Sequence, residues 1–262
     1  MDSLLQLIGR RLARYLTKPR KGGVHVASIR PEMLASALRK GDVLLVEGTS
    51  RASVAIKYLS QSTWSHATLF IGDALRPQLA GEEAKVLLEA DVSEGVRAVP
   101  LSVYSGLHTR ICRPVDLSPE DINAVVAYAV ARIGHTYDLK NIFDLARYLV
   151  RTPVPNRWKR RIISLGSGDP TRAICSTLIA QAFHSIRYPI LPDIVSEQSN
   201  DPACVECNRE ILHIRHHSLF MPRDFDTSPY FQIVKPVIEY GFDRHRLTWG
   251  DKERKTPQPG RG

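Results

Sequence analysis

Cysteine is scarce in this chain of 262 residues, with 4 in all, at Cys112, Cys175, Cys204 and Cys207. So few cysteines at uneven spacing do not make the disulfide framework of a small secreted domain. The sequence also lacks an apolar run of about 18 residues or more and an N-terminal secretory signal, which argues against a membrane-spanning helix and against export. We therefore expect a reducing compartment and a cytoplasmic protein.

Acidic residues are the minority among the charges. The 27 Asp and Glu stand against 36 Lys and Arg, which gives a formal net charge of +9. Such a surplus attracts phosphates, nucleic acid or anionic lipid head groups. The basic residues form only scattered local clusters, however, and no nucleic-acid-binding motif accompanies them. A non-enzymatic module that binds anionic polymers is therefore disfavoured, and nucleic acid is not expected as a partner.

The length and the hydrophobic content of 43% allow one sizeable core. Residues 1–23 are predicted to form a basic amphipathic helix and a linker, because Leu4, Ile8 and Leu12 share a stripe opposite several arginines. That stripe can lie on an anionic membrane surface or pack onto the protein itself, and the sequence does not choose between the two. Residues 24–190 are predicted to form the core, and residues 191–262 a C-terminal extension packed on it, with a frayed end.

Short apolar runs and amphipathic stretches predict an α+β fold. Strands are expected at 43–46, 67–71, 86–90 and 110–114, and helices at 119–133, 139–150 and from about 171 to 186. The connections between the strands are mostly too short for helical crossovers, which predicts a small antiparallel sheet. Ser118, followed by Pro119 and by Asp121 three positions on, has the features of a helix start, and Gly134 those of its end.

Cys175 lies near the predicted start of the last of these helices. The free amide hydrogens and the dipole of a first helical turn favour a thiolate, the form in which a cysteine acts as a nucleophile. Cys175 is also in register with Leu178, Ile179 and Ala182. A cysteine in such an apolar stripe is more often an inert core residue, so composition alone does not make Cys175 catalytic.

Five segments in a fixed order change that interpretation. They are GDVLLVEG at 41–48, WSHATLFIGD at 64–73, LLEAD at 87–91, GHTYD at 134–138 and ICSTLIAQAF at 174–183. In order and spacing they resemble the YiiX/YebB-like permuted papain-fold cysteine hydrolases, a group within the NlpC-type superfamily. The resemblance covers roughly residues 40–187 and implies a circularly permuted papain-like fold, in which the histidine strand precedes the cysteine helix.

The resemblance also implies a catalytic set. Cys175 would be the nucleophile, His66 the base that accepts its proton, and Glu89 the partner that orients the imidazole. Glu47 and Asp91 are nearby alternatives to Glu89. Backbone amides at the start of the cysteine helix could supply an oxyanion hole.

One departure from the family concerns the second position after the nucleophile. Many relatives have an acidic residue there, where this chain has Thr177. The departure bears on the range of substrates and not on the identity of the nucleophile.

A second group of residues has the chemistry of a zinc site. Cys204 and Cys207 have acceptable ligand spacing, and His213, His216 and His217 follow them. The interval from Cys207 to His213 is short for a zinc finger, and one cysteine pair is a weak signal. We therefore expect no cofactor and no metal, and predict that this segment covers the papain-like core.

The function predicted from the sequence is a cysteine hydrolase of the peptidase or amidase type that forms an acyl-enzyme. The alternative is a lipid-directed acyltransferase or thioesterase that uses the same intermediate at a membrane, where the basic N-terminal helix would hold it. The expected substrate is accordingly a peptide, another amide or an acyl lipid.

Overall fold

A computed structural model of the chain describes residues 27, 29–75, 81–91, 94–135, 174–198 and 208–248. The predicted N-terminal helix at 1–23, the helix at 139–150 and the frayed tail lie outside the described residues. The membrane contact suggested for the N-terminal helix therefore stays a prediction.

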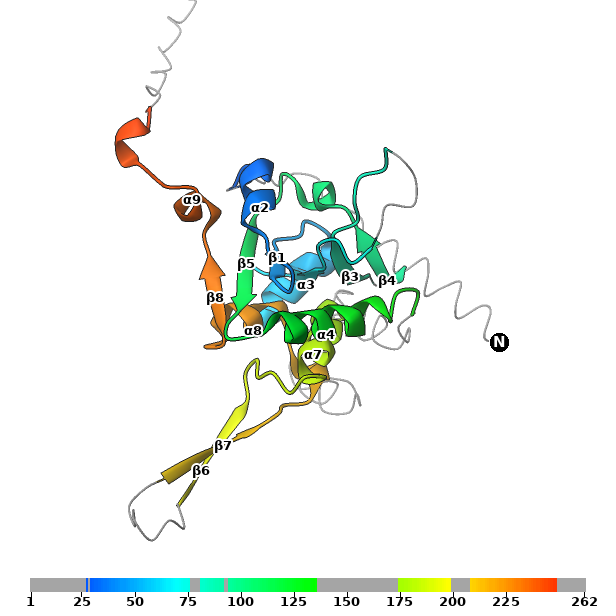
Figure 1. The fold of residues 1–262 in the computed structure, drawn as a ribbon, viewed down its shortest axis with the longest axis vertical. Coiled ribbons are helices and arrows are strands. Elements are labelled where there is room, and N and C mark those ends of the chain that lie inside the picture. Colours follow the sequence, from blue (N-terminus) through cyan, green and yellow to red (C-terminus); the bar gives the residue numbers. More distant parts are fainter. Residues whose placement is uncertain are drawn as a thin grey trace, which may run out of the picture.

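The centre of the molecule is a six-stranded antiparallel sheet (Figure 1). Its order is β4-β3-β2-β1-β5-β8, and each neighbouring pair runs antiparallel, as the short connections predicted. The strands are β1 (Val43–Val46), β2 (His66–Phe70), β3 (Leu87–Asp91), β4 (Gly95–Val99), β5 (Thr109–Pro114) and β8 (Phe231–Val234). Four of the six were expected from the sequence, within a residue or two at their ends.

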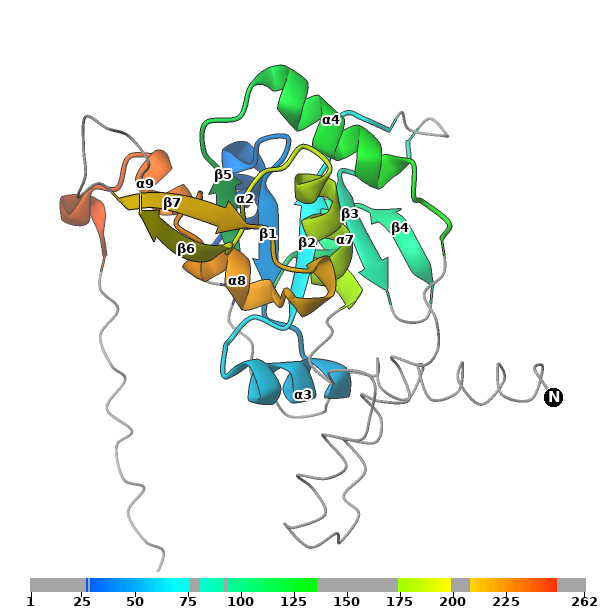
Figure 2. The same ribbon diagram turned by 90° about the horizontal axis from the view of Figure 1, so that it is seen from below.

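Helices lie around this sheet. The α-helices are α2 (Pro31–Ala37), α3 (Arg51–Ser60), α4 (Pro119–Val130), α7 (Ile174–His184), α8 (Pro222–Thr227) and α9 (Pro236–Glu239). Three 3₁₀ turns are η1 (Leu101–Tyr104), η2 (His217–Leu219) and η3 (Arg244–Arg246). Helix α7 contacts β2, β3 and α4, and α4 and α7 lie together on one side of the sheet (Figure 2).

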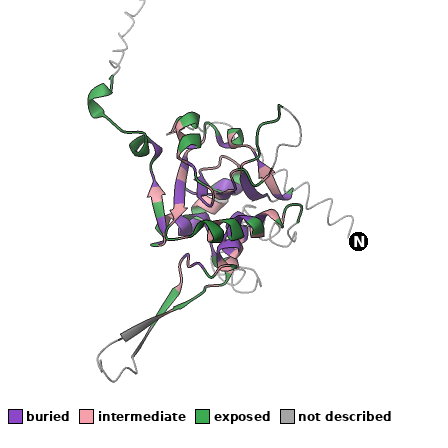
Figure 3. Cartoon of the chain, viewed as in Figure 1, coloured by how far each residue is buried: buried purple, intermediate pink, exposed green. Residues whose placement is uncertain are grey.

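The central strand β1 is buried along its whole length, because both faces of the sheet are covered. Val43 and Leu45 belong to the cluster that includes Ile179 and Phe183 of α7. Leu44 and Val46 face the opposite cluster, which includes residues of α2 and η1. Figure 3 shows the result as buried strands between helices whose outer surfaces are exposed. The alternation of one strand thus fixes two separate apolar layers.

Helix α4 begins as its sequence predicts. The Ser118 side chain accepts a hydrogen bond from the Asp121 backbone amide, and the Asp121 carboxylate accepts one from the Ser118 amide. Pro119 occupies the first turn, where its missing amide hydrogen costs nothing. Val125, Val126 and Ala129 then face the core, so the capping box and the apolar stripe agree.

The segment after residue 190 differs from the expected cover. Strands β6 (Asp193–Gln198) and β7 (Asn208–His213) pair with each other only and project away from the central sheet (Figure 1). Their apolar side chains Ile194 and Leu212 are exposed. The part that does pack on the core comes later, since Phe220, Phe225 and Phe231 join the cluster beneath α7.

Gly48, just after β1, sits where no other residue fits without movement. A β-carbon there would lie 2.2 Å from the Ser53 Oγ and 2.9 Å from the Ser65 Oγ, which accepts a hydrogen bond from the Gly48 amide. We expect Gly48→Ala to lower the free energy of unfolding by about 1 to 2 kcal/mol through this overpacking. Urea denaturation of the two proteins measures the difference. Equal midpoints would show that the side chains of Ser53 and Ser65 can move aside without loss of stability.

Candidate active site

His66 and Glu89 meet across neighbouring strands. His66 is the first residue of β2 and Glu89 the middle residue of β3. The His66 Nε2 and the Glu89 Oε2 lie 2.6 Å apart, and the Glu89 side chain is 3% exposed. With Nε2 engaged by a carboxylate, the neutral imidazole holds its hydrogen on Nε2 and leaves Nδ1 as the acceptor.

The buried Glu89 carboxylate has two further donors. The Arg97 Nε donates to Glu89 Oε1 over 2.8 Å from the paired position on β4, and the Tyr104 hydroxyl of η1 donates to Oε2. Both oxygens are therefore satisfied, which a buried carboxylate needs if it is to stay charged. The Tyr104 ring also lies 6.0 Å from the His66 ring between centroids.

Cys175 is the second residue of α7 and is 5% exposed. Its side chain is close enough to His66 to raise the pKa of the imidazole. The imidazole thus interacts with both the Glu89 carboxylate, through Nε2, and the Cys175 side chain. Two residues far apart in sequence, one on a strand and one at a helix start, are brought into contact.

The charges of this group reinforce one another. Burial alone would lower the pKa of His66, but the negative charges and hydrogen bonds of Cys175 and Glu89 outweigh it and raise that pKa to about 10. Burial alone would raise the pKa of Glu89, yet the bonds and charges of His66, Tyr104 and Arg97 lower it to about 2. The contacts of His66 and Glu89 therefore favour an imidazolium beside a carboxylate.

The contacts of Glu89 differ from those of Glu47 and Asp91, the two carboxylates named as alternatives. Glu47 pairs with Lys57 at 2.9 Å. Asp91 lies 3.9 Å from Arg97 and accepts a hydrogen bond from the Glu94 backbone amide. Of the three carboxylates, Glu89 is the one for which a His66 contact is found.

Sequence reasoning missed Arg97 and Tyr104. Arg97 had a detectable signal, because an arginine opposite a glutamate on paired strands forms a favourable cross-strand pair. That signal required β4 to be recognised, and β4 was not. Tyr104 lies in a 3₁₀ turn whose position relative to β3 no local pattern predicts.

The residues considered for zinc fall into two groups. Cys204 and Cys207 lie outside the described residues. His213 ends β7, and the His216 Nδ1 lies 2.7 Å from the Ser218 Oγ while its ring packs against that of His217 at 4.1 Å. Within the described ranges, no group of three or more His, Cys, Asp or Glu side chains could hold a metal ion.

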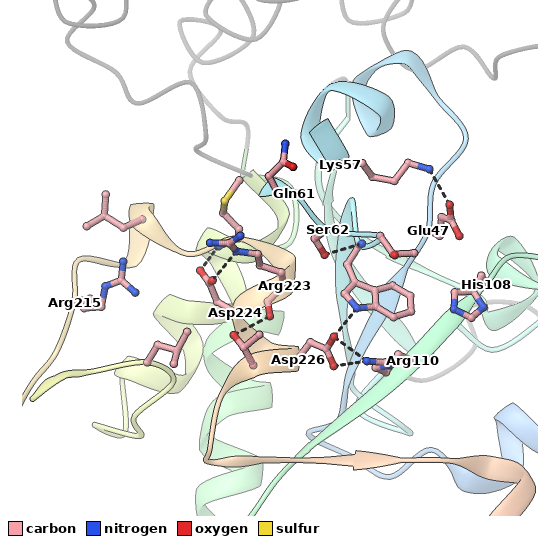
Figure 4. A pocket seen from close by; sticks show the side chains of 16 residues that line it. Glu47, Lys57, Gln61, Ser62, His108, Arg110, Arg215, Arg223, Asp224 and Asp226 are labelled. Carbon is pink, nitrogen blue, oxygen red and sulfur yellow. Dashed lines mark hydrogen bonds and ion pairs between the residues drawn. The ribbon is translucent and has the colours of Figure 1, made fainter. Parts of the chain in front are cut away.

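A cleft of about 1010 Å³ opens between α3 and α8. Figure 4 shows Arg215 and Arg223 on one wall and Lys57 and Glu47 on the other. Trp64 forms part of the lining, stacked on His108 with ring centroids 5.2 Å apart.

The cleft is tied to both residues of the Cys175–His66 pair. Trp64 precedes His66 by two positions in the chain. On the other wall, Met221 follows Phe220, whose carbonyl oxygen accepts a hydrogen bond of 2.6 Å from the Ser176 hydroxyl, next to Cys175. The two walls are thus continuous with the strand end that carries His66 and the helix start that carries Cys175.

Comparison with known proteins finds similarity over part of the chain. The sequence model of the family described as permuted papain-like amidase enzymes, YaeF/YiiX, C92 family, matches residues 37–148, a range that includes His66 and Glu89. The chain is 23% identical over 176 residues to the probable lipoprotein peptidase YaeF of Escherichia coli (strain K12). That match covers 61% of this chain, and the chain spans 60% of the length of YaeF.

A solved structure is also similar, the crystal structure of the metalloprotein YiiX from Escherichia coli O157:H7. It is 13% identical, with a TM-score of 0.39, and the match covers 76% of this chain and 97% of that one. In the part of the chain that the structure describes, no helix is long and apolar enough to cross a membrane.

Proposed function

Because the chain is a YiiX-like protein of the permuted papain fold, we propose that it cleaves amide bonds through a thioester formed on Cys175. The observation that supports this most directly is that the His66 imidazole interacts both with the Glu89 carboxylate, at 2.6 Å, and with Cys175. A thiolate beside an imidazolium is the nucleophile that such a cleavage needs.

The first half of the reaction forms the thioester. The Cys175 thiolate attacks the carbonyl carbon of the amide, and the electron pair of the carbonyl moves onto its oxygen. When that pair returns, the carbon–nitrogen bond breaks and His66 gives its proton to the departing amine. Backbone amides of the first turn of α7 are the groups we expect to stabilise the oxyanion.

The second half releases the acid. His66, now neutral, takes a proton from water as the water oxygen attacks the thioester carbonyl, and the carbon–sulfur bond breaks to restore the thiolate. Glu89 stays ionised throughout because Arg97 and Tyr104 hold both its oxygens. Its role is to keep the imidazole in one orientation and to stabilise it when it is charged.

An activated ester that acylates the nucleophile tests this proposal. We expect p-nitrophenyl acetate to leave an acetyl group on Cys175 that mass spectrometry detects after an acid quench and that hydroxylamine removes, as it does from a thioester. Cys112 is the matched control, because burial raises the pKa of its thiol. Cys112→Ala should therefore leave the acetyl group on Cys175 in place. Cys175→Ala should abolish both the adduct and the turnover.

The opposite result is equally clear. If the ester is hydrolysed at the same rate by Cys175→Ala, or if the acetyl group settles on another residue of the folded wild type, Cys175 is not the nucleophile. A second experiment, with fluorogenic peptide amides, tests the type of bond. We expect the wild type to release the amine from these substrates and Cys175→Ala not to release it.

A further inference from the structure

We propose that the cleft beside Trp64 binds the substrate and that Arg215 and Arg223 select an acidic peptide, one that carries a carboxylate near the bond to be cleaved. This rests on the proposed function and names its substrate class. The lining of the cleft is linked to the Cys175–His66 pair through Trp64, two residues before His66, and through Met221, which follows the Phe220 bonded by Ser176.

Several charges in the cleft are already neutralised by close partners. The Lys57 Nζ lies 2.9 Å from Glu47, and the Arg110 Nη1 lies 2.7 and 2.8 Å from the two oxygens of Asp226. Asp226 also accepts a hydrogen bond of 2.9 Å from the Trp64 indole. These groups shape the cleft, and their charges largely cancel there.

Arg215 and Arg223 are held differently. Arg215 lies 3.8 Å from Asp193, which is itself 73% exposed, and Arg223 lies 3.7 Å from Asp224. Both distances exceed those of a charge-assisted hydrogen bond, which are about 2.7 to 2.9 Å. The exposed pair of Arg215 and Asp193 is worth little, so a ligand carboxylate can displace Asp193 at small cost.

Arg223 is also held in place for binding. Its Nη1 donates a hydrogen bond of 2.5 Å to the Ser60 carbonyl at the end of α3, so the side chain reaches from α8 to the opposite wall. A guanidinium fixed by one nitrogen retains further donors in a planar fork that suits a carboxylate. Less ordering is then needed when the ligand arrives.

Asp224 does not cancel these two arginines. Its Oδ2 accepts a hydrogen bond of 2.8 Å from the Met221 backbone amide and so helps to begin α8. Burial raises the pKa of Asp224, although Arg223 and Arg215 act in the opposite direction. In the lining of this wall, one buried carboxylate thus faces two basic side chains, and the other nearby carboxylate, Asp193, is 73% exposed and screened by solvent.

The remaining lining favours a peptide over an acyl chain. Most of its side chains are charged or can form hydrogen bonds, and the apolar ones are few: Trp64, Leu191, Leu219 and Met221. A fatty chain would leave these polar groups without water or partners, at a cost that a peptide avoids. The lipid-directed alternative predicted from the sequence therefore gains no support from this cleft.

Matched covalent probes test the charge preference without a known substrate. The probes are N-chloroacetyl tripeptide amides of glycine in which one glycine, at each position in turn, is replaced by glutamate or by glutamine. We expect Cys175 to be alkylated about tenfold faster by the glutamate probe at the best position, because the two side chains differ in charge and hardly in shape. The rate is read by mass spectrometry of the Cys175 peptide.

Variants locate the preference. Arg215→Gln combined with Arg223→Gln should bring the ratio of glutamate to glutamine rates close to one, and Arg215→Glu should favour a lysine probe. Arg244→Gln combined with Arg246→Gln removes the same charge from η3, on exposed positions, and should keep the tenfold ratio. Each rate is divided by the rate of the same protein with chloroacetamide, which corrects for differences in the reactivity of Cys175 itself, and the η3 variant should match the wild type with that reagent.

The outcomes separate the two proposals. If Cys175 reacts with chloroacetamide but equally fast with both peptide probes, the acidic preference is wrong and the catalytic proposal stands. If the η3 variant loses the ratio as fully as the cleft variant, net charge and not this cleft is responsible. If Cys175 is inert to every reagent in the folded protein, the catalytic proposal fails and the substrate class fails with it.

Discussion

Replacing His66 with alanine is expected to slow the alkylation of Cys175 by iodoacetamide about 100-fold at pH 6. An ordinary thiol has a pKa of about 8.5, so only a fraction of roughly 1 in 300 is thiolate at that pH. In the wild type the pKa of His66 is raised to about 10 by the charges of Cys175 and Glu89, so an imidazolium stands beside the sulfur. A positive charge next to a thiol favours the reactive thiolate form. Mass spectrometry of the Cys175 peptide measures both rates.

The pH dependence adds a second test of the same pair. The wild-type rate should change little between pH 6 and pH 9, since the imidazolium persists across this range. In His66→Ala the rate should rise about tenfold per pH unit until an ordinary thiol is ionised. His184→Ala is the matched control, because His184 is in the last turn of the same helix and should leave the profile unchanged. Identical profiles for wild type and His66→Ala would show that His66 does not activate the sulfur.

Removing the Glu89 carboxylate should cost the folded protein about 3 kcal/mol near neutral pH, and this cost should shrink in acid. Burial opposes the charge, but His66, Tyr104 and Arg97 hold the pKa of Glu89 at about 2 against a usual value of 4.5. A carboxyl whose pKa is lowered on folding stabilises the protein above its unfolded pKa, and the benefit is lost as the pH falls towards the folded one. Glu89→Gln removes the benefit at every pH.

Urea denaturation of wild type and Glu89→Gln between pH 6 and pH 3 measures this effect. The stability advantage of the wild type over Glu89→Gln should fall by about 2 kcal/mol between pH 6 and pH 3. At the lower end of this interval His66 is protonated in both the folded and the unfolded state. Gly48→Ala is a useful control, since its cost comes from a steric clash and should be the same at each pH. If the difference in free energy of unfolding between wild type and Glu89→Gln does not change with pH, the pKa of Glu89 is the same in the folded and the unfolded state.

The part of the fold that the sequence predicts well is the part whose local pattern and burial agree. Strand β1 is a short apolar run between turn residues, and it is buried on both faces. Helix α4 combines a capping box with an apolar stripe. In both elements the residues of the element itself carry the signal, so the prediction did not depend on distant partners.

The elements that were missed depend on such partners. Strand β8 is four residues long, and its position at the edge of the sheet comes from pairing with β5, which lies far away in the chain. Strand β4 follows a polar turn and is recognisable mainly through its register with β3. Helix α3 is capped by Ser50, and among its described side chains Val54 and Tyr58 are exposed.

The candidate site shows the same division. His66, Glu89 and Cys175 were named from a family resemblance and not from their own surroundings, and the structure brings the three side chains together. Arg97 and Tyr104 were not predicted as site residues. Their hydrogen bonds to the Glu89 carboxylate come from a neighbouring strand and from a 3₁₀ turn, and no local sequence pattern indicates them. The cleft was not predicted either, since its walls come from α3, the end of the β6–β7 pair and α8.

The order of the site residues along the chain has a consequence for synthesis. His66, Glu89, Arg97 and Tyr104 all precede Cys175. While the ribosome is still making the first part of the chain, the strands that carry His66 and Glu89 can pair. The Cys175 thiol that these residues would activate has not yet been synthesised. The thiol arrives late and becomes reactive only when α7 settles against β2 and β3. An incomplete chain that ends before α7 would therefore carry the orienting half of the site and could not attack the proteins around it.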